Sequence, residues 1–211
     1  MLKKIGRPAK SQYQIESKQE IINATTQLIN NFGADYVTVR RVCEAAKVST
    51  GTFYHYFSDK DDLMMQFLRE TSFDGFELQT PSENISGLIC ELYMILIHKY
   101  QSLGENFMKS FYTTNNKSLS AYMGESDGKF APNTIMARSE YEMQKALELG
   151  IIHNESNIHE ICQDICTIVK GCVFEWCLSN GNTKIEIILN RIIKNYLENF
   201  LSKTKIPRSK N

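Results

Sequence analysis

Residues 49–57 read S-T-G-T-F-Y-H-Y-F, with four aromatic side chains in the last five positions and no formal charge. A core helix would keep its rings on one stripe, and a surface helix would carry few rings. Successive residues of an α-helix are 100° apart, so Phe53 and Phe57 lie one turn apart on the same side. The spacing therefore predicts a short helix anchored by these two buried rings.

The opposite side of this helix holds small or hydrogen-bonding residues: Gly51, Thr52 and His55. Tyr54 and Tyr56 flank that side, one at each margin. Such a face can approach another surface closely, with hydroxyls able to reach phosphates on both walls of a groove while its centre faces base edges. An aromatic-rich core helix with its tyrosines tucked in is the alternative that the geometry leaves open.

Two further helices precede the aromatic segment. Apolar residues recur at helical spacing over residues 15–32, and Gly33 ends that helix. Thr38 is placed to cap a second helix, V-R-R-V-C-E-A-A, and a link of three residues, 47–49, leads to the aromatic segment, which Ser49 can cap. Two short helices joined in this way predict a helix-turn-helix.

The run from Thr38 to Leu63, T-V-R-R-V-C-E-A-A-K-V-S-T-G-T-F-Y-H-Y-F-S-D-K-D-D-L, resembles the DNA-binding signature of TetR-family transcriptional repressors. The resemblance covers the first helix through the start of the fourth. It implies that the recognition helix enters the major groove with Thr50, Gly51, Thr52 and His55. It also implies phosphate contacts from Tyr54, Tyr56 and Lys60, and contacts to flanking backbone or an adjacent base from Thr38 and Arg40.

One residue departs from the family pattern. The family usually has Gly at the left-handed exit from the second helix, where this chain has Lys47. A non-glycine residue in that conformation costs roughly 1 kcal/mol. We interpret Lys47 as a further candidate phosphate contact.

The charge distribution agrees with an anionic partner for one end of the chain. The formal net charge is zero, but residues 1–58 carry eight Lys and Arg against four Asp and Glu, whereas residues 59–193 carry eleven against nineteen. Residues 194–211 are again basic, with five against one. A basic N-terminal module and an acidic body indicate that only the N-terminal module binds nucleic acid. The basic stretch at residues 3–10 could reach a neighbouring minor groove, or it could be a solvated tail.

We predict an all-α fold of about nine helices in two domains: a helix-turn-helix domain over residues 1–58 with a basic N-terminal arm, and a larger helical effector-binding and dimerisation domain over residues 59–211. Its helices are expected at about 59–79, 83–103, 105–113, 133–149, 157–179 and 184–202, with a long loop at 119–133 that is rich in Gly and Ser. The helices at 157–179 and 184–202 are apolar around more than one stripe, which requires a second buried surface. We therefore predict a twofold dimer through these two helices, which would read a palindromic operator.

The resemblance implies that the second domain binds a small-molecule effector whose binding changes the separation of the two recognition helices. An apolar or aromatic effector would fit the aromatic and sulfur side chains of the middle helices, although such a stripe is more often plain core. The candidates are Tyr93, Met94, Phe107, Met108, Phe111, Tyr112, Tyr122, Met123, Met136, Tyr141, Phe174 and Trp176.

Other functions have weaker support. His159, Cys162 and Cys166 share one helix face and could form a metal or redox sensor, or be core. No nucleophile elbow, P-loop, dinucleotide glycine signature or H-E-x-x-H occurs, so we expect no enzyme and no cofactor. An architectural DNA binder without a ligand is the third alternative. With cysteines in apolar surroundings, no apolar run long enough for a membrane span and no secretory signal, we expect a cytoplasmic protein.

Overall fold

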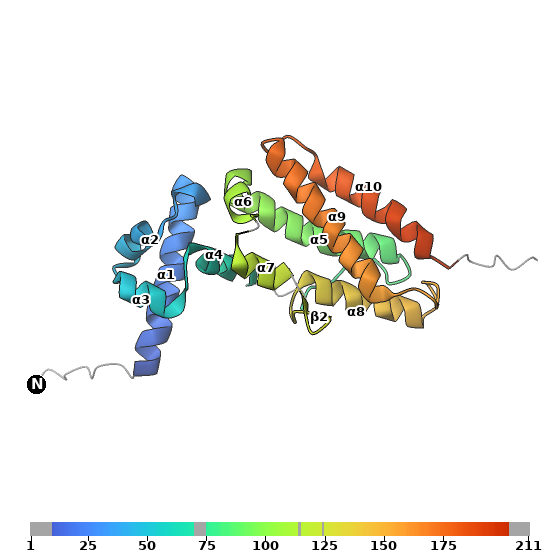
Figure 1. The fold of residues 1–211 in the computed structure, drawn as a ribbon, viewed down its shortest axis with the longest axis horizontal. Helices are drawn as coiled ribbons and strands as arrows, with labels where there is room; N and C mark the ends of the chain where they lie inside the picture. Colours follow the sequence, from blue (N-terminus) through green and yellow to red (C-terminus); the bar gives the residue numbers. More distant parts are fainter. Residues whose placement is uncertain (1–9, 70–74, 114, 124, 203–211) are drawn as a thin grey trace, which may run out of the picture.

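The computed structural model describes residues 10–69, 75–113, 115–123 and 125–202. Within them lie ten α-helices, two 3₁₀ turns and one short two-stranded ribbon, so the predicted all-α fold is confirmed. Figure 1 shows a small group of helices at the N-terminal end of an elongated molecule, with the other helices forming a larger body beyond α4. The predicted arm at 3–10 lies outside the described residues except for Lys10, which begins α1.

The small group consists of α1 (Lys10–Phe32), α2 (Val39–Ala46) and α3 (Thr50–Tyr56), with a 3₁₀ turn η1 (Ala34–Tyr36) between the first two. Its core is built from one apolar face of each helix and includes Ile21, Val42 and Phe53, none of which is measurably exposed. Phe57, just after α3, is 3% exposed. The predicted inward placement of both phenylalanine rings is therefore confirmed.

The sequence predicts a fourth helix that reaches residue 79, and this C-terminal end is wrong. We expected it over 59–79, but α4 spans Lys60–Arg69, and the described residues 75–84 are not helical. The Glu91 carboxylate accepts hydrogen bonds from the backbone N–H groups of Gln79 and Thr80, both at 2.7 Å. These bonds satisfy backbone donors that a helix would otherwise pair, and they hold the segment before Pro81 against α5.

The body contains α5 (Ile85–Leu103), α6 (Glu105–Phe111), α8 (Ile135–Glu148), α9 (Ile158–Leu178) and α10 (Ile185–Leu197), followed by a 3₁₀ turn η2 (Glu198–Phe200). Helix α5 packs against α8 and α10, and α9 packs against α6, α8 and α10 (Figure 1). In the described part of the chain, no helix is both long enough and apolar enough to cross a membrane.

The predicted loop over 119–133 is in part regular structure, which is a second correction. It contains most of α7 (Lys117–Met123) and an antiparallel ribbon of β1 (Glu125–Ser126) and β2 (Lys129–Phe130). The connecting Asp127 and Gly128 both have positive φ, as a tight two-residue hairpin turn requires. Glycine and serine favour loops, but α7 forms because Leu119, Tyr122 and Met123 are buried against the body.

Candidate DNA-binding surface and ligand cavity

Helices α2 and α3 form a capped helix-turn-helix. The Thr38 hydroxyl accepts from the backbone N–H of Arg41 at the start of α2, and the Ser49 hydroxyl accepts from that of Thr52 at 3.0 Å at the start of α3. Both caps fall where the sequence predicts them. The Ser49 hydroxyl is also 2.9 Å from the Thr52 hydroxyl, so the first turn of α3 is closely ordered.

The turn between the two helices is made by Lys47, which has a left-handed backbone with φ 55° and ψ 37°. Val48 N–H donates to the Cys43 carbonyl and Lys47 N–H donates to the Glu44 carbonyl, which together form a Schellman motif. These two bonds offset the cost of placing a non-glycine residue in this conformation. The turn keeps its geometry, and the Lys47 side chain is exposed.

One face of α3 lies open to solvent. Thr50, Gly51 and His55 are exposed, Thr52 is half-buried, and Tyr54 is 58% exposed. Tyr56 is half-buried, and its ring packs on the core. The Tyr56 and His55 rings meet edge to face, with their centroids 4.9 Å apart. A β-carbon added at Gly51 would meet only the Ser49 hydroxyl, at 3.6 Å, so glycine is not required there for folding.

The remaining predicted contacts surround this face. Arg40 is exposed on α2 and pairs with Glu44 at 2.9 Å, an exposed ion pair that contributes little to stability. Lys60 lies in the first turn of α4, where Asp59 caps the helix and the Ser58 N–H donates to Asp62. Because this helix end is acidic and already capped, it is poorly suited to bind phosphate, and the Lys60 side chain itself is the candidate contact.

Arg41 is an exposed cation of this domain that the sequence analysis did not single out. Its guanidinium lies 3.7 Å from the centroid of the Tyr36 ring and donates to the Tyr36 carbonyl at 3.1 Å. Tyr36 in turn packs on Phe32, with ring centroids 4.6 Å apart. The basic pair at 40–41 is visible in the sequence, but the aromatic ring that fixes Arg41 comes from η1.

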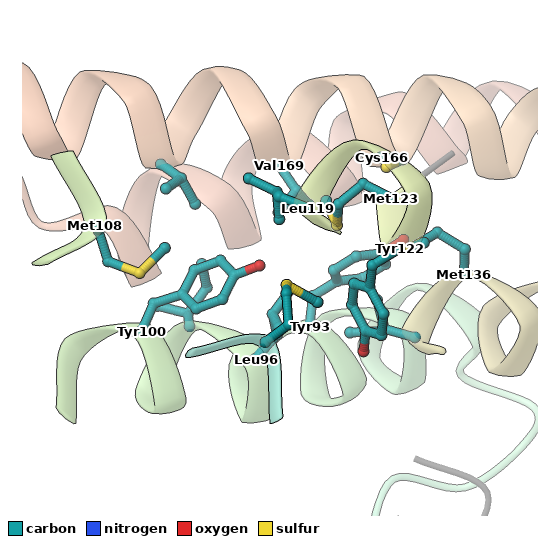
Figure 2. Close-up of a cluster of buried hydrophobic side chains, with 14 of the residues drawn as sticks. Tyr93, Leu96, Tyr100, Met108, Leu119, Tyr122, Met123, Met136, Cys166 and Val169 are labelled. Carbon is teal, nitrogen blue, oxygen red and sulfur yellow. The ribbon is translucent and has the colours of Figure 1, made fainter. Parts of the chain in front are cut away.

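Helix α6 provides a contact between the body and the small domain, because it packs against η1. Helix α7 packs against α4. Both α6 and α7 also contribute side chains to the interior of the body, including Met108 and Tyr122 (Figure 2). A change in that interior therefore has direct physical routes to the helix-turn-helix domain.

A cavity of about 290 Å³ opens between α6 and α9. Of the predicted ligand residues, Met108, Tyr112 and Phe174 line it, and Lys109, Cys177, Leu178 and Asn180 complete its walls. These last four residues were not among those predicted from the sequence. Lys109 donates to the Asn180 side chain at 2.6 Å on the solvent side.

The other predicted ligand residues are distributed through the body. Tyr93, Phe107, Phe111, Met136 and Trp176 are buried in the core, as are Tyr122 and Met123 of α7, and Met94 is half-buried. The Phe107 and Phe111 rings stack on each other at 5.0 Å. Tyr141 is separate from the rest: its side chain is 60% exposed and lines a different surface cavity with Arg138.

The geometry does not favour a metal or redox sensor at His159, Cys162 and Cys166. Cys162 and Cys166 are buried, and burial raises the pKa of both thiols, which disfavours the reactive thiolate. Cys162 lies against the Met143 sulfur. Within the described residues, no three His, Cys, Asp or Glu side chains form a cluster suited to a metal ion.

His159 instead holds the ribbon on the body. Its Nδ1 is 2.7 Å from a carboxylate oxygen of Glu140 on α8, its Nε2 is 3.3 Å from Glu125 on β1, and its ring lies 4.6 Å from that of Phe130 on β2. The hydrogen bond to Glu140, with a further contribution from Glu125, raises the pKa of His159 above its usual value.

We predict that His159→Gln lowers the melting temperature more at pH 6 than at pH 9. Because the native pKa is raised, the stabilisation by protonated His159 is fully present below the unfolded pKa of about 6.5 and is lost as pH rises through the native pKa. The extra loss at pH 6 should be about 1–3 °C, as expected for a partly exposed ion pair. Thermal denaturation of both proteins across this pH range measures it, and an equal loss at both pH values would contradict the assignment.

The capped helix-turn-helix and the open face on its second helix define residues 38–57 as a helix-turn-helix module of the kind that DNA-binding proteins carry. Residues 21–66 match the family model described as bacterial regulatory proteins, tetR family. HbdR, a transcriptional regulator of an Aromatoleum species, is 38% identical over 73 residues, which are 35% of this chain and 31% of HbdR. The repressor AcnR of Corynebacterium efficiens is 36% identical over 70 residues, 33% of this chain and 36% of AcnR.

Residues 21–66, which include α2 and α3, are therefore similar to the DNA-binding region of the TetR family. The match to these curated relatives spans about a third of their length. The fold as a whole is similar to solved structures. The structure of RolR in complex with resorcinol has a TM-score of 0.59 at 15% identity, covering 92% of this chain and 99% of RolR. The fatty acid degradation regulator FadR of Bacillus halodurans has a TM-score of 0.52 at 18% identity, covering 92% and 97%.

Proposed function

We propose that the chain is a transcriptional repressor that binds a palindromic DNA operator as a twofold dimer and is released from it by a small apolar or aromatic ligand. The observation that carries this proposal is the open face of α3, where small and hydrogen-bonding side chains are exposed while the two phenylalanines are buried. A helix with such a face can lie in the major groove with its backbone close to the base edges.

The roles of individual residues are part of the proposal. In the major groove we assign Thr50, Gly51, Thr52 and His55; on phosphates we assign Lys47, Tyr54, Tyr56 and Lys60; and on flanking backbone or an adjacent base we assign Thr38 and Arg40. Because the Thr38 hydroxyl already caps α2, it can contact DNA only while keeping that bond. We place the boundary between the DNA-binding and effector-binding domains at residues 58 and 59, just before α4.

The dimer is proposed to form through α9 and α10. Ile187 on α10 is a large apolar residue with 62% of its surface exposed. Between the two helices lies a groove of about 360 Å³ lined by residues that include Ile168, Gly171, Ile188 and Ile192. Covering these residues with the same helices of a second copy would remove them from water, and a contiguous exposed apolar patch is typical of an interface.

The ligand part of the proposal draws support from the cavity between α6 and α9 and from related folds. RolR has been solved with resorcinol, and FadR of Thermus thermophilus, which has a TM-score of 0.51 at 15% identity, has been solved with lauroyl-CoA. A ligand favours the DNA-incompetent state only if it binds that state more tightly. The contacts of α6 with η1 and of α7 with α4 could communicate that preference to the DNA-binding domain.

The proposal is tested by titrating the full chain against labelled duplexes from the DNA that flanks its own gene, beside an unrelated duplex, at several salt concentrations. A repressor should prefer one palindrome by at least ~1,000-fold, with affinity that falls steeply as salt rises. Equal, weak binding to all duplexes would instead favour an architectural DNA binder, the second candidate.

Tyr54→Phe is expected to weaken binding to every duplex by a similar factor, about fivefold. The exposed hydroxyl is assigned to a phosphate, so its loss removes roughly 1 kcal/mol without changing base readout. Tyr36→Phe provides a matched control, because Tyr36 is another exposed tyrosine of the same domain and lies in η1. The same titration measures both variants, and parental affinity for the Tyr54 variant would refute the phosphate assignment.

A further inference from the structure

The buried tyrosine hydroxyls without a hydrogen-bond partner in the described residues include those of Tyr100 and Tyr112. Tyr100 on α5 is 1% exposed, and Tyr112 follows directly after α6. Their rings meet edge to face, with centroids 6.3 Å apart. Neither hydroxyl oxygen makes a hydrogen bond with any described part of the chain. Because an unpaired buried hydroxyl has a free-energy cost, such groups are rare in native proteins and require an explanation.

Tyr112 connects this pair to the cavity of about 290 Å³ between α6 and α9, because its side chain forms part of the cavity wall. Met108, Phe174 and Cys177 provide apolar and aromatic lining, and the Lys109–Asn180 hydrogen bond lies at the solvent side. The volume is near the lower end of small-molecule sites, so it fits a compound of about one aromatic ring.

The interior beyond Tyr112 is built from side chains that can rearrange. Figure 2 shows Tyr93 and Tyr100 projecting from α5 toward Cys166 and Val169 of α9, with Met108, Met123 and Met136 among the surrounding side chains. These four residues and the three methionines are all buried. Methionine is unbranched and flexible, so this lining can adapt to a ligand that reaches Tyr100.

The protonation state of the pair limits what it can bind. Burial raises the pKa of Tyr100 well above its usual value, and burial likewise raises the pKa of Tyr112. Both hydroxyls therefore stay protonated near neutral pH and can each donate one hydrogen bond. A ligand that satisfies them must supply an acceptor.

We propose that the effector is a small aromatic compound with an acceptor oxygen, whose ring lies against Met108 and Phe174 and whose oxygen accepts hydrogen bonds from Tyr112 and Tyr100. This inference rests on the proposed function, because it names the chemical class of the ligand of the same domain. The acceptor oxygen distinguishes the ligand from a purely apolar compound of the same shape, which would leave both hydroxyls unpaired.

Three probes of nearly identical shape test the proposal on the full chain. Acetophenone carries a neutral acceptor oxygen, α-methylstyrene replaces it by CH₂, and benzoate carries a carboxylate. Binding is followed by calorimetry and by the fluorescence of Trp176, the single tryptophan, whose neighbour Cys177 lines the cavity. We expect acetophenone or benzoate to bind about tenfold more tightly than α-methylstyrene, which is the discrimination that one or two buried hydrogen bonds provide.

Tyrosine-to-phenylalanine variants locate the contact. Tyr112→Phe and Tyr100→Phe should each reduce the preference for the oxygen-bearing probe, and the double variant should abolish it. Tyr141→Phe is the matched control, because that tyrosine is exposed on α8 and lines a different cavity. Equal binding of the oxygen-bearing probes and α-methylstyrene, no binding of acetophenone or benzoate at ~1 mM, or an unchanged preference in the double variant would overturn the proposal.

The melting temperature without ligand separates a binding role from a structural one. Removing an unpaired buried hydroxyl should raise the melting temperature of Tyr100→Phe, by about 2–4 °C, whereas removing a hydroxyl that stabilises the fold should lower it. A lowered value would overturn the proposal. Operator titration of the same preparations tests the proposed function separately. If the protein binds an operator but none of the oxygen-bearing probes, only this inference is refuted. If it binds the probes specifically but no operator, the proposed function is refuted.

Discussion

Gly171→Arg is expected to make the protein monomeric and to weaken operator binding by about a thousandfold. Gly171 lies on α9 and lines the groove between α9 and α10, and a β-carbon at this position would meet no other atom within 4 Å. The folded monomer therefore has room for a side chain, and Arg has a higher helix propensity than Gly. In the proposed dimer, the long charged side chain would instead be forced into an apolar interface with a second copy.

Loss of the dimer should weaken operator binding because it separates the two recognition helices. In a dimer the second half-site is bound at an effective concentration in the millimolar range, and a monomer loses this advantage. Light scattering measures the mass, and the duplex titration measures the affinity. Gly171→Ala is the matched control and should remain dimeric with parental affinity. A dimeric Gly171→Arg protein would place the interface elsewhere on the molecule.

Gly51→Leu is expected to reduce operator affinity by about a hundredfold while leaving the domain folded. The only close neighbour of a new β-carbon at Gly51 is the Ser49 hydroxyl at 3.6 Å, and the position is exposed in the first turn of α3. Leucine also favours the helix over glycine by up to about 1 kcal/mol. The lost affinity comes from the DNA side, because the bulk would hold α3 away from base edges whose contacts contribute about 1–3 kcal/mol each.

Two measurements separate this effect from misfolding. The melting temperature of Gly51→Leu should equal or exceed that of the parent, and Gly51→Ala should lose less affinity than the leucine variant because a methyl group projects less. If Gly51→Leu binds the operator as tightly as the parent, the open face of α3 is not the surface that reads DNA.

The helix-turn-helix was largely predictable because its determinants are local. The caps at Thr38 and Ser49 and the inward placement of Phe53 and Phe57 depend on residues no more than one or two turns apart. Lys47 was a departure from the expected glycine, yet the turn formed, because backbone bonds from residues 47 and 48 stabilise the left-handed conformation. The roles of these residues on DNA remain predictions.

The errors arose where a distant partner decided the local structure. Residues 75–79 are not helical because the carboxylate of Glu91, on α5, accepts hydrogen bonds from the backbone N–H groups of Gln79 and Thr80. The ribbon at 125–130 is held by His159, which comes from α9, and α7 forms where its apolar residues meet the body. Periodicity and turn residues report the preference of a short segment, and they carry no information about such partners.

The sequence by itself determined the class of helix-turn-helix, the all-α architecture and the apolar faces of α9 and α10, because helix periodicity, capping and composition are encoded in neighbouring residues. Only the tertiary structure decided which of the many aromatic side chains share a cavity. Tyr112 and Phe174 lie together on it, whereas Tyr141 lies on another surface. The Tyr100 hydroxyl is unpaired because none of the side chains packed around it provides a hydrogen-bond partner. These neighbours come from several helices, so no single segment of the sequence predicts this.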